Sequence, residues 1–154
     1  MLKRKLFSFA LIMGLATTAF ANDCSFTIKT TDMMTGVDMN GNRVKSITIP
    51  ATCQHFTIHM WHIGKMPKTA MGHNIVIAKT TEINRIVKDG VRYGIKSDYI
   101  KPGDERVLVA SPMIGGGEKT FVRFSVDKIK KDDYSFFCSF LGHDRKMRGK
   151  LVVQ

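Results

Sequence analysis

Residues 136–147 read Phe-Phe-Cys-Ser-Phe-Leu-Gly-His-Asp-Arg-Lys-Met and lead into a last apolar run at residues 150–153. Within this stretch Cys138 precedes His143 by five residues, and Met147 follows His143 by four. A thiolate, an imidazole and a thioether on one short segment form a soft nitrogen and sulfur ligand set. Such a set suits copper far better than magnesium or calcium. We therefore interpret this stretch as a metal-binding loop.

The set lacks a second imidazole, and one candidate lies upstream. Met71-Gly72-His73-Asn74 stands directly before the apolar run at residues 75–78. Two histidines, one cysteine and a weakly bound methionine make a trigonal copper site of the kind used for electron transfer. Zinc is a competitor, because Cys and His bind it well, but Met is a poor zinc ligand. A catalytic Cys–His pair is a further alternative, which no accompanying motif supports.

The N-terminal segment predicts a secretory signal peptide over residues 1–21. Residues 3–5 (Lys-Arg-Lys) form a positive head, residues 6–15 are apolar, and residues 19–21 (Ala-Phe-Ala) are typical of a cleavage site. The apolar run is shorter than the roughly 20 residues of a membrane-spanning helix, so we expect no stable membrane anchor. We expect cleavage after this segment and a single periplasmic domain over residues 22–154.

The chain is basic, with 24 Lys and Arg against 13 Asp and Glu and a formal net charge of +11. Loss of residues 3–5 lowers the net charge to about +8. The basic residues are scattered, and neither a basic block nor an RNA-binding motif with interleaved aromatic residues accompanies them. We therefore expect no nucleic-acid binding. A positive field would still speed encounter with partners that have an acidic surface.

The chain has three cysteines, so at least one of them cannot form a disulfide within the exported chain. Cys24 and Cys53 lie near the start of the mature region, each beside a strand-like run, whereas Cys138 lies in the ligand stretch. The economical assignment is a Cys24–Cys53 disulfide with Cys138 left as a thiolate. Metal ligation would protect that thiolate in an oxidising compartment.

Short runs of alternating apolar and polar residues dominate the remaining sequence, and Gly- or Pro-containing turns separate them. This pattern predicts an all-β sandwich or barrel. About eight strands are expected, at residues 25–29, 46–49, 55–60, 75–78, 107–110, 120–126, 134–138 and 150–153. The segment 31–43 is expected to be an irregular loop.

One stretch, residues 81–90, has helical spacing of its apolar residues instead. We expect a short helix there, capped by Thr80 or Thr81 at its start and ended by Gly90. In the strand at residues 55–60 the alternation continues to His62, which should lean inward. His55, His59 and Trp61 should face outward.

With these elements placed, the chain resembles the azurins, small bacterial copper proteins of the cupredoxin family. The resemblance covers nearly all of the mature chain. It implies an eight-stranded Greek-key β-sandwich with one short helical flap and a type 1 copper centre near one end. The matching motifs are Cys24, Cys53-x2-Phe56-Thr57, Gly64-x2-Pro67-Lys68, Met71-Gly72-His73-Asn74, Asp98-Tyr99-x-Lys101-Pro102, Gly115-x-Gly117-Glu118-Lys119 and Phe136-Phe137-Cys138-x-Phe140-x-Gly142-His143-x3-Met147.

The resemblance implies a role for each ligand residue. His73, Cys138 and His143 would be the three strong equatorial ligands of one copper ion. Met147 would be a long axial ligand, and the backbone carbonyl of Gly72 would approach the opposite axial face.

The resemblance also implies roles around the ligands. The side chain of Asn74 should tie the two ligand loops together through Ser139, and Phe140 should shield the metal from water. His62 would be a titrating group close to the centre. An apolar docking rim should form from Leu141, Met66 and Met71. Leu141 departs from the family pattern, because azurins usually have a proline there.

The function implied is that of a periplasmic one-electron carrier that cycles copper between Cu(I) and Cu(II) and is not an enzyme. Its partners would be redox proteins such as a c-type cytochrome or a periplasmic reductase. Arg145 and Lys146, beside the rim, favour a partner with an acidic docking surface. The alternative function is a copper-binding chaperone or buffer that delivers copper in the periplasm. A copper enzyme would need a further ligand cluster, and the sequence suggests none.

Overall fold

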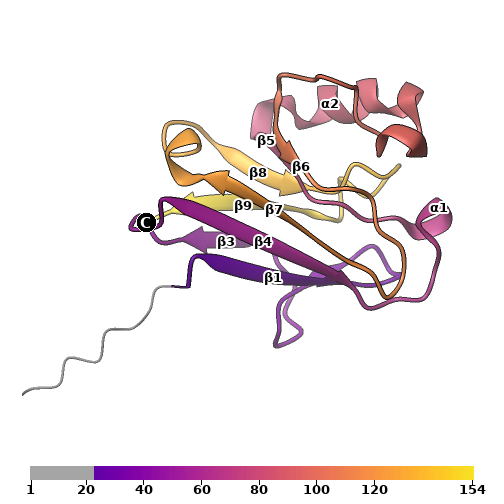
Figure 1. Ribbon diagram of the computed structural model, residues 1–154, viewed down its shortest axis with the longest axis horizontal. Coiled ribbons are helices and arrows are strands. Elements are labelled where there is room, and N and C mark those ends of the chain that lie inside the picture. The colour runs from indigo at the N-terminus through magenta and orange to yellow at the C-terminus, as the bar shows by residue number, and fades with distance from the viewer. Residues whose placement is uncertain (1–22) are drawn as a thin grey trace, which may run out of the picture.

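Two packed β-sheets form the part of the chain that this computed structural model describes, residues 23–154 (Figure 1). The predicted signal peptide, residues 1–21, lies outside the described residues. One sheet has the strand order β2-β1-β4-β7, and the other has the order β3-β9-β8-β5-β6. Within residues 23–154, no helix has the length and apolar character needed to span a bilayer.

The strands are β1 (Ser25–Thr30), β2 (Gly36–Val37), β3 (Ser46–Ile49), β4 (His55–His62), β5 (Val76–Lys79), β6 (Val107–Ala110), β7 (Lys119–Ser125), β8 (Tyr134–Phe137) and β9 (Arg148–Val153). The helices are α1 (Lys68–Met71) and α2 (Ile83–Gly90), with 3-10 turns η1 (Thr80–Glu82), η2 (Val91–Tyr93), η3 (Ile95–Ser97) and η4 (Val126–Lys128). The predicted all-β cupredoxin-like sandwich with a helical flap is therefore confirmed.

Alternating burial explains why β4 is a strand, and it confirms the predicted parity. Phe56, Ile58 and Met60 point into the core between the sheets, and the side chain of His62 points the same way. The residues between them face outward or lie half-buried. Each large apolar side chain that is fully buried stabilises the fold by about 1.5–3 kcal/mol. This gain makes a one-residue slip of register costly.

The segment 31–43 differs from the irregular loop that we expected. It contains the short strand β2, whose Val37 pairs with Lys29 and whose Gly36 pairs with Thr30 at the end of β1. A two-residue strand is too short to show alternation, so periodicity could not reveal it.

The predicted helix is confirmed as α2, which ends at Gly90 as expected, but neither Thr80 nor Thr81 caps its start. The side chains of Ile83 and Ile86 pack on the five-stranded sheet, whereas Thr80 bonds through its hydroxyl to Ser135 and does not cap the helix. Gly90 keeps helical dihedral angles, with φ −65°, and the chain continues into η2. A Cβ at Gly90 would collide with the carbonyl oxygen of Tyr99. The α-helix ends at Gly90 without the left-handed conformation of a terminating glycine, and the glycine is needed there for close packing.

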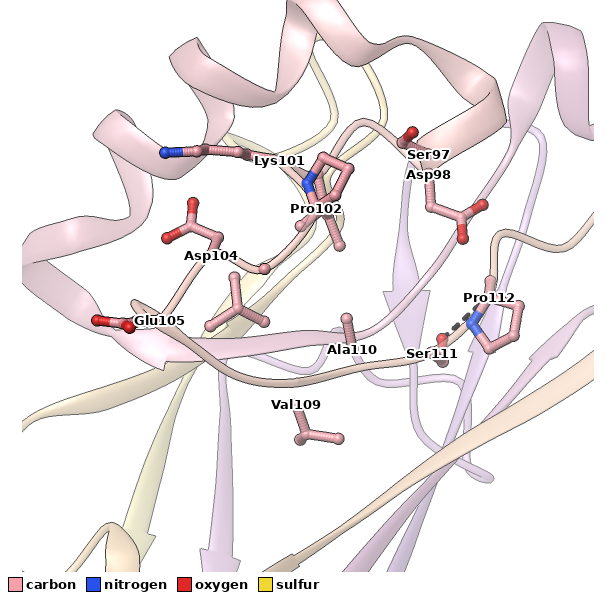
Figure 2. A pocket seen from close by; sticks show the side chains of 13 residues that line it. Ser97, Asp98, Lys101, Pro102, Asp104, Glu105, Val109, Ala110, Ser111 and Pro112 are labelled. Carbon is pink, nitrogen blue, oxygen red and sulfur yellow. Dashed lines mark hydrogen bonds between the residues drawn. The ribbon is translucent and has the colours of Figure 1, made fainter.

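An open hollow of about 620 Å³ lies between the connection that follows η3 and strand β6 (Figure 2). Lys101, Asp104 and Glu105 line one side of it, and Ala110 and Ser111 line the other. Its lining contains no histidine or cysteine. It therefore offers none of the soft ligands that the sequence analysis singled out.

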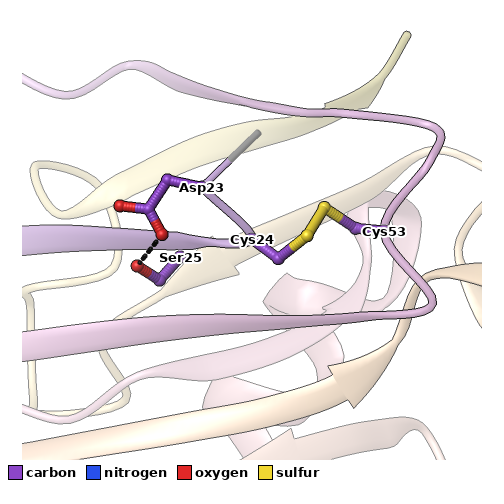
Figure 3. The surroundings of a disulfide bond; sticks show 4 residues. All are labelled: Asp23, Cys24, Ser25 and Cys53. Atoms are coloured by element: carbon purple, nitrogen blue, oxygen red, sulfur yellow. Dashed lines mark hydrogen bonds between the residues drawn. A yellow bond between two sulfur atoms is a disulfide. The ribbon is translucent and has the colours of Figure 1, made fainter. Parts of the chain in front are cut away.

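The predicted disulfide is confirmed between Cys24, just before β1, and Cys53, just before β4 (Figure 3). β1 and β4 are neighbouring parallel strands, with Ser25 opposite Thr57. The disulfide therefore fixes the start of this strand pair.

Replacement of both Cys24 and Cys53 by Ala should lower the free energy of unfolding by about 3–4 kcal/mol, because the closed loop spans 29 residues. Urea unfolding of the metal-free chain, followed by circular dichroism, measures the change. An unchanged midpoint would show that the cross-link does not restrict the unfolded chain as assumed.

Candidate metal centre

The three predicted strong ligands come together in the structure. One ligand atom from each of His73, Cys138 and His143 lies within 4.8 Å of the others. The sulfur of Cys138 is 4.0 Å from Nδ1 of His73 and 3.7 Å from Nδ1 of His143. The three side chains are between 0% and 2% exposed. The cluster is therefore formed by the folded chain itself and is closed off from bulk water.

Sheet pairing explains how residues 65 positions apart meet. β5 and β8 are antiparallel neighbours with Val76 opposite Phe137. His73 lies just before β5 and Cys138 just after β8, so both lie at the same end of the strand pair. His143 is brought back toward Cys138 by a turn in which its own amide donates to the carbonyl of Phe140 (3.0 Å).

The two predicted axial groups also lie beside the cluster. The carbonyl oxygen of Gly72 is 3.8 Å from the sulfur of Cys138. Met147 is buried and lines the same small internal space as Cys138. A Cβ at Gly72 would come within 2.5 Å of the carbonyl oxygen of Lys68 and 2.7 Å of Cγ of Met113. Position 72 therefore requires glycine for this carbonyl to approach.

A backbone carbonyl fixes the orientation of the His73 ring. Nε2 of His73 lies 3.0 Å from the carbonyl oxygen of Thr31, to which it donates. The lone pair is then on Nδ1, the atom nearest the sulfur of Cys138. Sequence reasoning missed Thr31, because any residue type supplies a backbone carbonyl and no side-chain pattern marks it.

A buried pair of hydrogen bonds joins the two loops, as predicted for Asn74 and Ser139. Nδ2 of Asn74 donates to the hydroxyl of Ser139 (2.8 Å), and the amide of Ser139 donates to Oδ1 of Asn74 (2.9 Å). The Ser139 hydroxyl in turn donates to the carbonyl of Asp98 (2.6 Å). Each partner lies directly next to a metal-ligand candidate, so these bonds set the separation of the two loops.

Asp98 and Tyr99 have a role that the sequence did not reveal. Both have φ of +52°, a left-handed conformation that non-glycine residues rarely adopt. The carboxylate of Asp98 accepts from the amide of Met113 (3.1 Å), and the ring of Tyr99 packs edge-on against Phe140 at 5.3 Å between centroids. The Phe140 ring lies 4.6 Å from the ring of His143. Phe140 thus packs directly against His143, and its expected shielding of the metal from water stays a prediction.

His62 forms a second layer behind His73. The centroids of the two rings are 4.5 Å apart, and Nε2 of His62 lies 3.0 Å from a carboxylate oxygen of Asp32. The other oxygen of Asp32 accepts from the amide of Lys65 at 2.9 Å. Sequence reasoning missed Asp32, because it lies 30 residues from His62 and no motif links the two. The expected titration of His62 stays a prediction.

Burial shifts the pKa values of all three clustered groups toward their neutral forms. Desolvation lowers the pKa of His73 and of His143 to about 4. Desolvation raises the pKa of the Cys138 thiol to about 11, although the backbone amides of Asn74 and Phe140 stabilise the thiolate by hydrogen bonding. At neutral pH the metal-free cluster therefore holds two neutral imidazoles and a protonated thiol.

The predicted rim residues lie near the surface. Leu141 is 51% exposed and Met66 is 38% exposed, while Met71 is half-buried. Leu141 belongs to the loop between Cys138 and His143, so at least one exposed apolar side chain adjoins the cluster.

Comparison with known proteins agrees with this geometry. Residues 24–154 match the sequence profile of the copper binding proteins of the plastocyanin/azurin family. The chain belongs to this family. It is 42% identical to azurin iso-2 of Methylomonas sp. strain J over 132 residues, which cover 85% of this chain and 98% of the relative. It is 40% identical to the azurin of Bordetella pertussis over 154 residues, 99% of each chain.

A solved azurin structure has the same fold as this chain. The azurin Az-iso2 from Methylomonas sp. strain J superposes with a TM-score of 0.77 at 42% identity, over 85% of this chain and 98% of the azurin. The donor set also fits a copper ion of this family, because two neutral imidazole nitrogens and one sulfur point to a common space in a water-excluded interior.

Asn74→Ala should destabilise the metal-free chain by about 2–4 kcal/mol, because it leaves the amide and hydroxyl of Ser139 short of buried partners. Urea unfolding measures the loss. Asn84→Ala, at an exposed position that bonds to Arg148, is the matched control and should change stability by less than about 0.5 kcal/mol. Equal losses in the two variants would contradict the role given to Asn74.

Uptake of one copper(II) ion at pH 7 should release about one proton, which comes from the Cys138 thiol, because both imidazoles are already neutral. A pH-stat titration measures the release. Affinity should rise with pH up to the thiol pKa of about 11, since protons compete with the metal below it. Release of two or more protons would show that the histidines are charged in the metal-free chain.

Proposed function

We propose that this protein is a periplasmic one-electron carrier that holds one copper ion. His73, Cys138 and His143 would be its strong ligands, with the Met147 thioether and the Gly72 carbonyl in weak axial positions. The observation that carries the proposal is the buried convergence of two Nδ1 atoms and one sulfur within 4.8 Å. Bound copper would supply the Cu(I)/Cu(II) couple.

The surrounding residues hold the donors in place before metal binds. The Thr31 carbonyl fixes the His73 ring, and the bonds between Asn74 and Ser139 fix the loop separation. The amides of Asn74 and Phe140 donate to the sulfur of Cys138. These donors stabilise negative charge on sulfur and thereby tune the reduction potential. A fixed set of ligands also keeps the geometric change between oxidation states small, which favours fast electron transfer.

The exposed rim supports transfer to another redox protein. Leu141, on the loop that carries His143, presents exposed apolar surface, and the side chain of Met66 is exposed as well. Arg145 and Lys146 follow on the same loop and are exposed. We propose that the partners are redox proteins, such as a c-type cytochrome or a periplasmic reductase, whose docking surface is acidic. The predicted signal peptide, residues 1–21, supports the periplasmic location.

Burial favours carriage over copper delivery. A delivery protein must expose its metal to the recipient, whereas the three proposed ligands are at most 2% exposed. We therefore propose that the copper stays bound through the redox cycle and that the protein transforms no substrate.

The copper-loaded protein should show an intense visible absorption from sulfur-to-copper charge transfer and a narrow copper hyperfine splitting in electron paramagnetic resonance. Cys138→Ser should lose the visible band, because the sulfur donor is gone. Its circular dichroism spectrum should stay that of the wild type, since serine fits the space of the buried thiol. A colourless copper(II) form of the wild type, or a variant that keeps the band, would refute the assignment.

A further inference from the structure

The outer side of the four-stranded sheet combines aromatic and cationic side chains that the proposed copper chemistry does not use. Strand register aligns these side chains in three rows across β1, β4 and β7. The rows are Lys29–Trp61–Lys119, Thr27–His59–Phe121 and Ser25–Thr57–Arg123. We call these nine residues, together with Ile63 just beyond β4, the β4–β7 face. The helix α2 packs on the other sheet, so it does not cover this face (Figure 1).

The centre of the β4–β7 face is apolar and open. Phe121 is 60% exposed, Ile63 is 45% exposed, and Trp61 is 37% exposed. Trp61 and Ile63 share the outward parity of β4, and Phe121 lies in the row next to that of Trp61. Exposed aromatic and aliphatic side chains that are contiguous on one face mark a surface for interaction.

Cations surround this centre. Nζ of Lys119 lies 4.6 Å from the centre of the Trp61 ring, Lys29 stands on the opposite side of Trp61 in the same row, and Arg123 ends the third row. None of the three rows contains Asp or Glu. The face thus has three positive charges around an apolar centre against one carboxylate at its edge, Asp23, which accepts from the Ser25 hydroxyl (2.8 Å), and this net positive charge favours a negatively charged occupant.

A second copy of this chain is a poor occupant, because it would place three cations against three cations. Anionic phospholipid fits better. Tryptophan settles at the boundary between lipid headgroups and acyl chains, and Lys and Arg extend their charged ends to the phosphates. On this face Trp61 lies between Lys29 and Lys119, and the open side of the sheet can lie against a lipid bilayer. Anionic lipid also attracts each cation close to it without requiring a specific bonding geometry.

We propose that the β4–β7 face binds reversibly to membrane surfaces rich in anionic phospholipid. Trp61, Phe121 and Ile63 enter the headgroup region, while Lys29, Lys119 and Arg123 contact lipid phosphates. Ligand-loop residues such as Leu141 take no part in this contact. The copper-binding end thus stays free to meet redox proteins embedded in the same membrane, and the search for them is confined to two dimensions.

Trp61 is the single tryptophan of the chain, so its fluorescence reports on this face directly. The test uses the copper-loaded, reduced chain that begins at residue 22, which removes the apolar N-terminal segment. The described residues 23–154 contain both packed sheets and the Cys24–Cys53 disulfide, so this part of the chain keeps the whole described fold. Vesicles of phosphatidylcholine with one third phosphatidylglycerol should shift Trp61 emission to shorter wavelength. Vesicles of phosphatidylcholine alone should leave it unchanged.

Two variants with matched controls locate the contact. Lys29→Gln/Lys119→Gln should weaken vesicle binding, measured by co-sedimentation, by about tenfold or more. Lys45→Gln/Lys88→Gln removes the same charge elsewhere and should weaken it less than about threefold. Phe121→Ser should weaken binding by about fivefold or more, whereas Val152→Ser, at an exposed position of the other sheet, should have little effect.

The proposal is overturned if anionic vesicles do not shift Trp61 emission, or if the control variants lose as much binding as the test variants. It is also overturned if Trp61 responds to soluble polyglutamate and not to vesicles, because the face would then belong to an acidic protein. None of these results depends on electron transfer, so the proposed copper function is tested separately by its visible spectrum.

Discussion

The hydrogen bonds between Asn74 and Ser139 hold together the two loops from which the metal-binding side chains come. Each residue directly follows a proposed ligand, His73 on one side and Cys138 on the other, so a change of their separation would move both ligands. Both side chains are buried, where a satisfied hydrogen bond is strong and an unsatisfied one is costly. The carbonyl of Asp98, held in a left-handed conformation, extends this network to the connection that follows α2.

Burial of the three clustered side chains sets their protonation states. It disfavours charge on every donor, which keeps the imidazoles neutral and available but holds the thiol protonated until a metal replaces the proton. The backbone supplies the compensating polar contacts, from the carbonyl of Thr31 to the amides that face Cys138. The interior can therefore exclude water around a soft metal without leaving these polar atoms unpaired.

Strand β4 connects the two surfaces that we assign to interaction. Its alternation places His62 in the core against His73 and places Trp61, one residue earlier, on the outside beside Lys119. The docking rim presents the apolar side chains of Leu141 and Met66, whereas the β4–β7 face mixes aromatic rings with cations. The two surfaces differ in chemistry and suit different occupants. One chain can thus present its redox end to a protein while a separate face holds it at a lipid surface.

Much of this structure follows from local sequence patterns. Alternation predicted the strands and the inward-facing side chain of His62. The spacing around Cys138 predicted a metal-binding loop with soft ligands. The odd number of cysteines, with Cys138 assigned to the metal, predicted the Cys24–Cys53 disulfide. These features depend on side-chain type and spacing, which a sequence displays directly. The strand β2, the packing role of Gly90 and the contacts of Thr31, Asp32 and Asp98 were decided by tertiary structure alone. They depend on backbone groups and on distances between segments far apart in the chain, and no local residue pattern records either.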